Sequence, residues 1–239
     1  MKLLVAGPAY WPTEEITQKK FWLYLASCRK YGINPHLYGP RTDRYEGGAK
    51  MRIYGLVDFL KTVDASYTHV LFSHVWDVLF TAPLPDVIAK YERFGSPPLL
   101  MGAAKQDISD IHPPESDRYL PLWDQTQRYW YPAWSMYLAE IPYILDRFAQ
   151  IEKGYHNDCL PLLNALERRI LEPVYDRQCE IFQTVIESNP EIDVIAGRAY
   201  NSLTGTYPAL IHFLLGESDQ QTGKDKSIIP WARRLGILE

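Results

Sequence analysis

Short apolar segments typical of buried strands alternate with helix-patterned segments over about the first hundred residues, and this alternation constrains the fold more than any other feature of the chain. The predicted strands cover residues 2–6, 35–38, 68–72 and 99–102. Helical spacing is expected from Thr13 to near Gly32, from near Lys50 onward and over residues 84–94. Strand and helix in alternation favour an α/β domain with a doubly wound sheet.

The pattern changes after Ala104. From Ala104 to Trp134 the chain is rich in Pro, Asp, Ser and aromatic residues without a clear period, which predicts a long irregular loop of a functional kind, such as a flap. Helical periodicity returns over residues 141–151 and 160–170. Short strands are expected at residues 180–184, 192–196 and 209–212.

The 239-residue chain has no Gly/Ser-rich or charge-rich linker, which favours one domain over two. Hydrophobic residues make up 46% of it and aromatic residues 13%, enough to bury a core and still line a cleft. We expect a single α/β domain over residues 1–216, with a central, mostly parallel twisted sheet flanked by helices. Residues 217–239 are expected to form a C-terminal tail that docks on this domain through Trp231.

Charge and cysteine content narrow the classes of partner and compartment. The net charge of −4 argues against a field that drives binding to nucleic acid or anionic lipid. Cys28, Cys159 and Cys179 have no metal-type spacing and, being odd in number, no closed disulfide framework. The apolar start ends too early for a signal peptide, and no apolar run is long enough to span a bilayer. We therefore expect a soluble, cytoplasmic protein.

Polar residues that follow a buried strand carry functional weight, because ligands of open α/β sheets bind beyond the carboxyl ends of the strands. His74 and Asp77 follow the strand at residues 68–72. A carboxylate here suits Mg²⁺ or Mn²⁺, and an imidazole nitrogen is accepted more readily by Mn²⁺. The alternative is a surface loop in which Asp77 caps the next element. Trp76, between them, is a candidate for stacking on a nucleobase, although a tryptophan taken alone is more often a core residue.

Three further segments are weaker candidates. Gly47-Gly48-Ala49-Lys50 precedes a helix, so its backbone can approach a phosphate while Lys50 and Arg52 supply charge. Asn157 or Asp158 opens a later helix, where an N-cap is the simpler interpretation. His212 ends the last predicted strand and would be a metal ligand only beside a partner such as Asp77. Neither a Walker A loop nor a dinucleotide-binding fingerprint is present.

Taken in order, these segments resemble the glycosyltransferase domain of the procollagen lysyl hydroxylase/glucosyltransferase family, which is of GT-A type, over roughly residues 2–216. The resemblance lies in a Gly-Gly-x-Lys-x-x loop, a strand with an Asp-x-x-Asp motif, an acidic pair, an Asp-x-x-Cys-x-Ile-Phe-Gln stretch and a terminal strand ending in histidine. The corresponding residues are 47–52, 70–78, 157–158, 176–183 and 208–212. The resemblance implies a GT-A-like, Rossmann-like fold.

The resemblance also implies roles for individual residues. Asp77 takes the second metal position, Trp76 the position that stacks on uracil, and His212 completes the metal site. Lys50 contacts the donor, and Gly48, Ser73 and Val5 join it in the donor site. Asp158 matches the acidic pair near the acceptor, where Asn157 replaces a carboxylate.

The chain departs from the family pattern at several positions. His74 stands where the family has its first aspartate, as a third metal ligand or as the mark of a different or weaker metal dependence. Phe213-Leu214-Leu215-Gly216 replaces the expected Gly-Asn-Gly-x-x-Lys run, and Pro132–Met136 replaces a Gly-rich segment before the acceptor helix. Acceptor specificity is therefore not carried over.

The resulting hypothesis is a glycosyltransferase that uses Mn²⁺ or Mg²⁺ and a UDP-sugar, UDP-glucose or a relative, as donor. The acceptor is open: a hydroxyl of a protein, a glycan, a small molecule or a modified nucleobase. Lys105, Arg118 and Arg128 around the irregular loop keep nucleic acid as one option. The alternatives are a non-catalytic nucleotide-sugar-binding module that has lost its metal site and an unrelated structural α/β domain.

Overall fold

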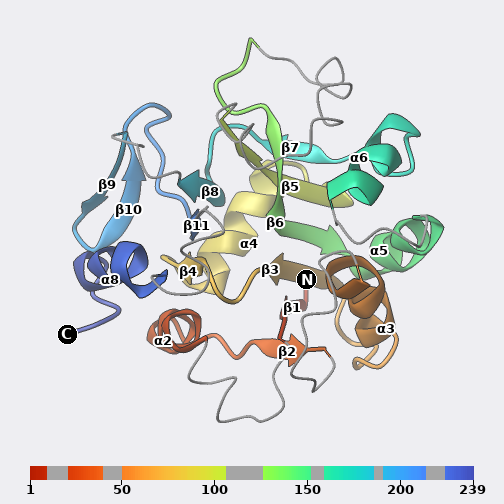
Figure 1. Ribbon diagram of the computed structural model, residues 1–239, viewed down its shortest axis with the longest axis horizontal. Helices are drawn as coiled ribbons and strands as arrows, with labels where there is room; N and C mark the ends of the chain where they lie inside the picture. Colours follow the sequence, from red (N-terminus) through yellow and green to blue (C-terminus); the bar gives the residue numbers. More distant parts are fainter. Residues whose placement is uncertain (10–20, 40–49, 106–125, 152–158, 186–190, 214–223) are drawn as a thin grey trace.

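A computed structural model describes residues 1–9, 21–39, 50–105, 126–151, 159–185, 191–213 and 224–239. Its central sheet has six strands in the order β2-β1-β3-β6-β5-β7 (Figure 1). These strands are β1 (Leu3–Pro8), β2 (His36–Tyr38), β3 (His69–Ser73), β5 (Leu99–Ala104), β6 (Tyr131–Glu140) and β7 (Val174–Asp176). Five run parallel to one another and β6 is antiparallel to its two neighbours. The prediction of an α/β fold with a mostly parallel sheet is confirmed.

Both faces of the central sheet are buried, which explains why its strands read as continuous apolar runs. Along β1, Leu4 and Ala6 pack into one core cluster and Val5 into another on the opposite face. The first cluster is covered by α3 (Leu56–Leu60), α5 (Ile141–Arg147) and α6 (Cys159–Glu167), and the second by α2 (Trp22–Lys30) and α4 (Leu84–Arg93). The helices thus enclose the sheet from two sides (Figure 1).

A second, three-stranded sheet lies beside the first, with the order β4-β11-β8. It consists of β4 (Val78–Phe80), β11 (Leu210–Phe213) and β8 (Phe182–Val185), and β9 (Ile192–Ile195) and β10 (Arg198–Asn201) form a separate hairpin. Helix α8 (Lys224–Arg234) packs on this part of the molecule, since Ile228 and Ala232 are buried with Leu79 and Ile211. Trp231 contacts Phe213, with ring centroids 5.8 Å apart.

Most of the predicted elements are present, with shifted ends. The helix expected near Lys50 begins as a π-helical turn, η1 (Lys50–Gly55), and continues as α3. The helix expected over residues 141–151 is α5 followed by a 3₁₀ turn, η4 (Phe148–Gln150). Only the second part of the helix expected from Thr13 falls among the described residues, as α2. The short strands β4, β7 and β10 were not expected from local sequence.

Strand β6 corrects one prediction, because Tyr131–Trp134 belong to a strand and not to an irregular loop. Its residues are buried on both faces, so no alternation marks the strand. Pro132 argues against a central strand, but it pairs only with Ala103 of β5, beyond the part of β6 that pairs with β3. Strand β6 therefore tolerates a proline where it has one neighbour. The preceding residues, 106–125, lie outside the described part.

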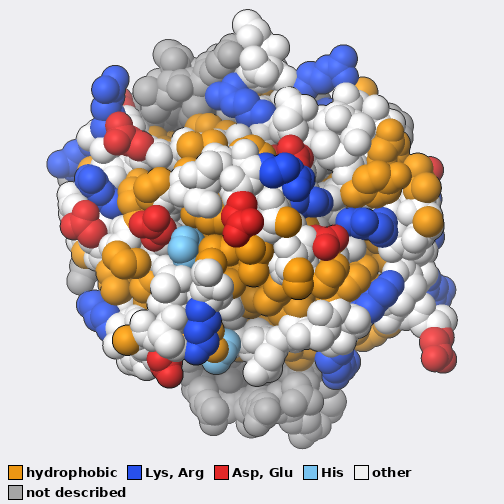
Figure 2. Space-filling view, turned by 180° about the vertical axis from the view of Figure 1, so that it is seen from behind, with side chains coloured by type: hydrophobic (Ala, Val, Ile, Leu, Met, Phe, Trp, Pro, Cys, Tyr) orange, Lys and Arg blue, Asp and Glu red, His pale blue; other side chains and the backbone are white. Residues whose placement is uncertain are grey.

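The surface carries charges of both signs. On the face shown in Figure 2, Lys and Arg side chains are interspersed with Asp and Glu around a central area of hydrophobic side chains. No large area of one sign covers the described residues of this face. None of the helices in the described part of the chain combines the length and the apolar character needed to cross a membrane.

Candidate functional site

The turn between β3 and β4 brings two predicted metal ligands to the carboxyl end of a parallel strand. Strand β3 ends at Ser73, His74 follows it, and Asp77 precedes β4 directly. The backbone N–H of His74 donates to the carbonyl of Ser135 on β6, at 2.9 Å, so the antiparallel strand holds this turn in place. Both side chains are buried, His74 to 3% exposure and Asp77 to 7%.

Strand β11 brings the third predicted ligand to the same place. His212 is directly opposite Val78 in the antiparallel pairing of β4 and β11, one residue from Asp77. The N–H of Phe213 donates to the carbonyl of Asp77 at 2.8 Å, which locks the pairing at this point. The register of two short strands therefore places His212 beside Asp77, although the two residues are far apart in the sequence.

The three side chains form a compact cluster. Asp77 lies between the histidines, with Oδ1 3.4 Å from His74 Nδ1 and Oδ2 3.5 Å from His212 Nε2. One ligand atom from each residue can be chosen so that all lie within 4.8 Å of one another. Two atoms bound to one ion at about 2.1 Å are roughly 3 to 4 Å apart, so this geometry is close to that of a metal site. These residues therefore lie together, contrary to the alternative of an unrelated domain in which they stay apart.

Burial and neighbouring charges keep two members of the cluster, His74 and Asp77, in the protonation state that metals require. Burial, followed by the positive charge of Arg52, lowers the pKa of His74 to about 4, so its imidazole is neutral. Burial alone would raise the pKa of Asp77, but the neighbouring His212 and His74 lower it well below its ordinary value. A neutral imidazole and an ionised carboxylate are both ready to ligate an ion without losing a proton.

Several buried polar atoms of the cluster lack hydrogen-bond partners among the described residues. They are both ring nitrogens of His74, Oδ1 of Asp77 and Nδ1 of His212. Buried polar atoms are normally satisfied, and leaving one without a partner costs roughly 1–3 kcal/mol. A divalent cation would satisfy such acceptor atoms, so the residues present fit a metal ion.

The other predicted donor-site residues lie at different distances from this cluster. Trp76 is half-buried, and its ring centroid is 5.1 Å from that of His74. Ser73 is fully buried, and its hydroxyl is 3.1 Å from that of Tyr24 on α2. Val5 is a core residue of β1, 2% exposed, in the cluster that contains Val75. The Trp76 ring thus contacts a member of the candidate metal cluster.

Four predicted residues are not placed by the structure. Gly48, Asn157 and Asp158 lie outside the described residues, and of Lys50 only the backbone, at the start of η1, is described. Their proposed roles stay predictions. Arg52, two residues further along η1, is described, and its guanidinium carbon is 5.9 Å from the centroid of the Trp76 ring.

Ser135 contributes to the site but was not expected from the sequence. Its carbonyl accepts the N–H of His74 and thereby orients the first residue after β3. No local signal marks it, because β6 itself was not expected at this position. Its role follows from backbone pairing, which depends on the strand order and not on the side chain.

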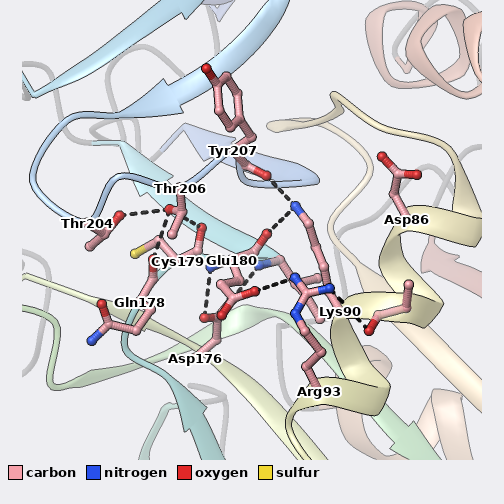
Figure 3. A network of polar contacts seen from close by, with 12 residues as sticks. Asp86, Lys90, Arg93, Asp176, Gln178, Cys179, Glu180, Thr204, Thr206 and Tyr207 are labelled. Atoms are coloured by element: carbon pink, nitrogen blue, oxygen red, sulfur yellow. Dashed lines mark hydrogen bonds and ion pairs between the residues drawn. The ribbon is translucent and has the colours of Figure 1, made fainter.

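The Asp176–Gln183 stretch, the most specific match to the family pattern, makes a structural turn. Asp176 accepts three backbone N–H bonds, from Glu180, Ile181 and Phe182 at 2.7 to 2.9 Å. Cys179 has a φ of 51° and is fully buried within this turn. Thr206 closes the turn by donating to the carbonyls of Gln178 or Cys179 (Figure 3). The motif thus fixes the chain just before β8, the neighbour of His212's strand.

Comparisons with known proteins bear on the fold. No protein-family model and no curated protein sequence matches the chain. Among solved structures, a glycosyltransferase involved in the glycosylation of the major capsid of PBCV-1 has 10% sequence identity and a TM-score of 0.54, with 94% of this chain and 100% of that chain covered. The synthetase of CMP:2-keto-3-deoxy-manno-octonic acid, complexed with CTP, has 11% identity and a TM-score of 0.39 over 73% of this chain and 90% of that chain.

The first of these similarities extends over both chains almost completely. At 10% identity it shows a shared fold and no more. The narrower resemblance to the lysyl hydroxylase/glucosyltransferase family remains a prediction that rests on the motifs. The chain therefore has an α/β fold of GT-A-like architecture, with a buried His-Asp-His cluster at the carboxyl end of β3.

Proposed function

We propose that the protein is a metal-assisted glycosyltransferase that transfers a sugar from a nucleotide-sugar donor to a hydroxyl acceptor. The observation that carries the proposal is the buried cluster of His74, Asp77 and His212, several of whose polar atoms lack hydrogen-bond partners among the described residues. Its location supports the proposal, because open α/β sheets bind ligands beyond the carboxyl ends of their strands. The similarity in fold to a glycosyltransferase supports it further.

In this proposal His74, Asp77 and His212 hold Mn²⁺, or Mg²⁺, against the diphosphate of the donor. The bound ion would neutralise the negative charge that develops on the departing nucleoside diphosphate. Asp77 supplies the carboxylate of the ligand set, and the two histidines supply ring nitrogens. Two imidazoles in a set of three favour Mn²⁺ over Mg²⁺.

The remaining donor contacts follow from the positions around this cluster. Trp76 lies beside His74 and is partly exposed, a suitable surface for the uracil of a UDP-sugar such as UDP-glucose. Lys50 and the backbone of Gly48 are assigned to the phosphates, with Ser73 and Val5 along the strand ends. Asp158, with Asn157 beside it, is assigned to the acceptor or to the positive charge that develops at the anomeric carbon.

A thermal-shift panel of nucleotides and nucleotide-sugars, with and without Mn²⁺, tests the proposal. A UDP-sugar at a hundred times its Kd should stabilise the protein by about 2.7 kcal/mol when Mn²⁺ is present. Asp77→Ala should abolish this stabilisation, whereas Asp58→Ala, at an exposed aspartate of α3, should leave it intact.

Two outcomes would contradict the proposed glycosyltransferase. If no nucleotide stabilises the wild-type protein, or if Asp77→Ala leaves the effect unchanged, the proposed donor site is wrong. Stabilisation that depends on Asp77 without any transfer or hydrolysis of the sugar would identify a non-catalytic binding module. If the protein instead transfers or hydrolyses the sugar, a screen of protein, glycan, small-molecule and nucleobase hydroxyls would identify the acceptor.

A further inference from the structure

Arg52 places a permanent positive charge close to the candidate metal site. Its guanidinium carbon is 5.9 Å from the centroid of the Trp76 ring, and that centroid is 5.1 Å from the centroid of His74. The side chain is half-buried and comes from η1, the turn in which the chain leaves its α-helical spacing. A π-helical turn of this kind often marks a functional segment.

Arg52 and His74 contact the same aromatic ring, that of Trp76. The charge of Arg52 also acts on a neighbouring strand. It counteracts the effect of burial on the pKa of Tyr137, a residue of β6 whose ring stacks on Phe72 at 4.6 Å. Arg52 therefore lies over the Trp76 ring, which His74 also contacts.

The balance of charge follows from these positions. The ligand set holds a single carboxylate, Asp77, and two imidazoles. A divalent ion bound there would leave one positive charge uncompensated by its ligands, and Arg52 adds a charge of the same sign nearby. Like charges in a water-poor site repel strongly, so a metal ion without its substrate is opposed by Arg52.

A bound diphosphate reverses the effect of Arg52 on the metal ion. It carries at least two negative charges, and a guanidinium binds phosphate oxygens through a planar pair of N–H donors. With the diphosphate between the ion and Arg52, each positive charge faces phosphate oxygens. The same arginine that weakens binding of the ion alone would strengthen binding of the ion and diphosphate together.

We propose that Arg52 couples the two ligands, opposing the metal ion when it is alone and binding the diphosphate when both are present. The inference rests on the proposed function, since it assumes that the cluster holds a metal ion and that the donor is a nucleoside diphosphate. Metal and nucleotide then bind cooperatively, and by linkage each raises the affinity of the other by the same factor.

Substitution of Arg52 tests this coupling because two affinities should move in opposite directions. In Arg52→Gln, Mn²⁺ alone should bind more tightly, by about three- to tenfold, as the repulsion is removed. The affinity for UDP at saturating Mn²⁺ should fall, by a factor on the order of ten or more. Electron paramagnetic resonance of free Mn²⁺ measures the first quantity, and isothermal titration calorimetry with UDP measures the second.

Two further variants separate charge from geometry. Arg52→Lys keeps the positive charge and loses the planar donor pair, so Mn²⁺ affinity should stay near that of the wild type while UDP affinity falls. Arg147→Gln, at an arginine of α5 that contacts Asp146 and Tyr143, should change neither affinity. Thermal unfolding of each variant establishes that it is folded.

The inference is overturned if Arg52→Gln weakens both ligands together, which is the result expected of a purely structural residue. It is also overturned if the wild-type protein binds Mn²⁺ equally well with and without UDP. A wild-type protein that binds neither Mn²⁺ nor UDP overturns the proposed function, and the inference with it. Binding of both ligands without coupling overturns the inference alone.

Discussion

His74 determines the chemistry of the ligand set more than any other single residue. With its ring nitrogen, the cluster combines one carboxylate with two imidazoles. Mg²⁺ prefers oxygen ligands, whereas imidazole is a ligand for the transition metals. The burial of His74, at 3% exposure, prevents solvent from replacing it easily in this role.

The substitution His74→Asp should shift metal preference towards Mg²⁺. Relative to Mn²⁺, the affinity for Mg²⁺ should rise on the order of tenfold, because a second carboxylate adds a hard oxygen ligand and a negative charge. Titration calorimetry with each ion, in the presence of UDP, measures the ratio. His36→Asp, in β2, should leave the ratio unchanged. An unaltered ratio in His74→Asp would mean that His74 is not a ligand.

Among the secondary-structure elements, the end of β1 supports the metal-ligand turn directly. Gly7 of β1 lies against this turn, and a Cβ at this position would meet the side chain of Val75 and approach the carbonyl oxygen of Ser73 to 2.7 Å. Only a glycine allows the strand to come this close to the residues on either side of His74. The turn geometry is therefore set by packing between β1 and the β3–β4 connection.

Gly7→Ala should impair the site as well as the fold. Overpacking of this kind costs about 1–3 kcal/mol, and the displaced Val75 lies between His74 and Asp77, so Mn²⁺ affinity should fall too. Gly32→Ala is the matched control, since its φ of 66° strains an alanine but nothing lies within 4 Å. The control should lower the melting temperature without changing Mn²⁺ binding. Equal Mn²⁺ affinities in wild type and Gly7→Ala would refute the packing argument.

Helix α4 is tied to two loops by a lysine near its C-terminal end. Lys90 Nζ donates to the carbonyl of Glu180, at 2.7 Å, and to that of Tyr207 (Figure 3). One turn later, Arg93 pairs with the carboxylate of Glu180 at 2.6 Å. Burial, assisted by the charge of Arg198, lowers the pKa of Lys90 to about 8, although Asp176, Asp86 and Glu180 act in the opposite direction.

This lowered pKa predicts a pH-dependent contribution to stability. Between the folded value of about 8 and the ordinary value of 10.5, the unfolded chain binds a proton that the folded chain has lost. The contribution of Lys90 to the free energy of unfolding therefore rises with pH in this window. The free energy of unfolding of the wild type, minus that of Lys90→Met, should rise by roughly 1 kcal/mol from pH 7 to 9.5, allowing for solvent screening.

Urea denaturation at several pH values measures this difference. Lys61→Met serves as the control, because Lys61 is exposed and forms an ion pair with Asp58 at 3.4 Å. The difference between Lys61→Met and wild type should stay constant with pH. If the free energy of unfolding of the wild type, minus that of Lys90→Met, falls as the pH rises, the expected sign of the lysine's contribution is contradicted.

At the scale of the whole molecule, the C-terminal helix belongs to the same core as a candidate metal ligand's strand. Ala232 of α8 and Leu235, the residue that follows this helix, are buried together with Ile211 and Phe213, the two neighbours of His212 in β11. Lys30 of α2 also donates to the carbonyl of Leu235. The division of the chain into residues 1–216 and a tail stays a prediction, but these contacts join α8 to the rest.

Leu235→Ala should therefore destabilise the whole molecule and not the tail alone. The expected loss is about 2–5 kcal/mol in the free energy of unfolding, as for other fully buried leucines. Leu238→Ala, at a partly buried position in the same cluster, should cost less. Circular dichroism and tryptophan fluorescence should report one shared transition. Two separate transitions would show that α8 unfolds independently of the sheets.

Local sequence by itself determined the order of most strands and helices, with β4, β6, β7 and β10 as exceptions, and the positions of the candidate ligands. Burial and periodicity are recorded residue by residue, so the predicted ranges of β1, β3, β5 and α4 lie within a few residues of their bounds. Asp77 and His212 were recognisable because each lies at the end of a strand. The mostly parallel sheet followed from the same alternation.

Only the tertiary structure showed which contacts bring the candidate site residues together. Strand β6 inserts antiparallel between β3 and β5, and its carbonyl at Ser135 holds His74, which no local pattern revealed. The register of β4 against β11 brings His212 to Asp77, and η1 carries Arg52 over Trp76. Such contacts depend on the pairing of segments distant in sequence, and pairing is set by the packing of the whole core. The sequence thus identified the candidate ligands, and only the fold brought them together.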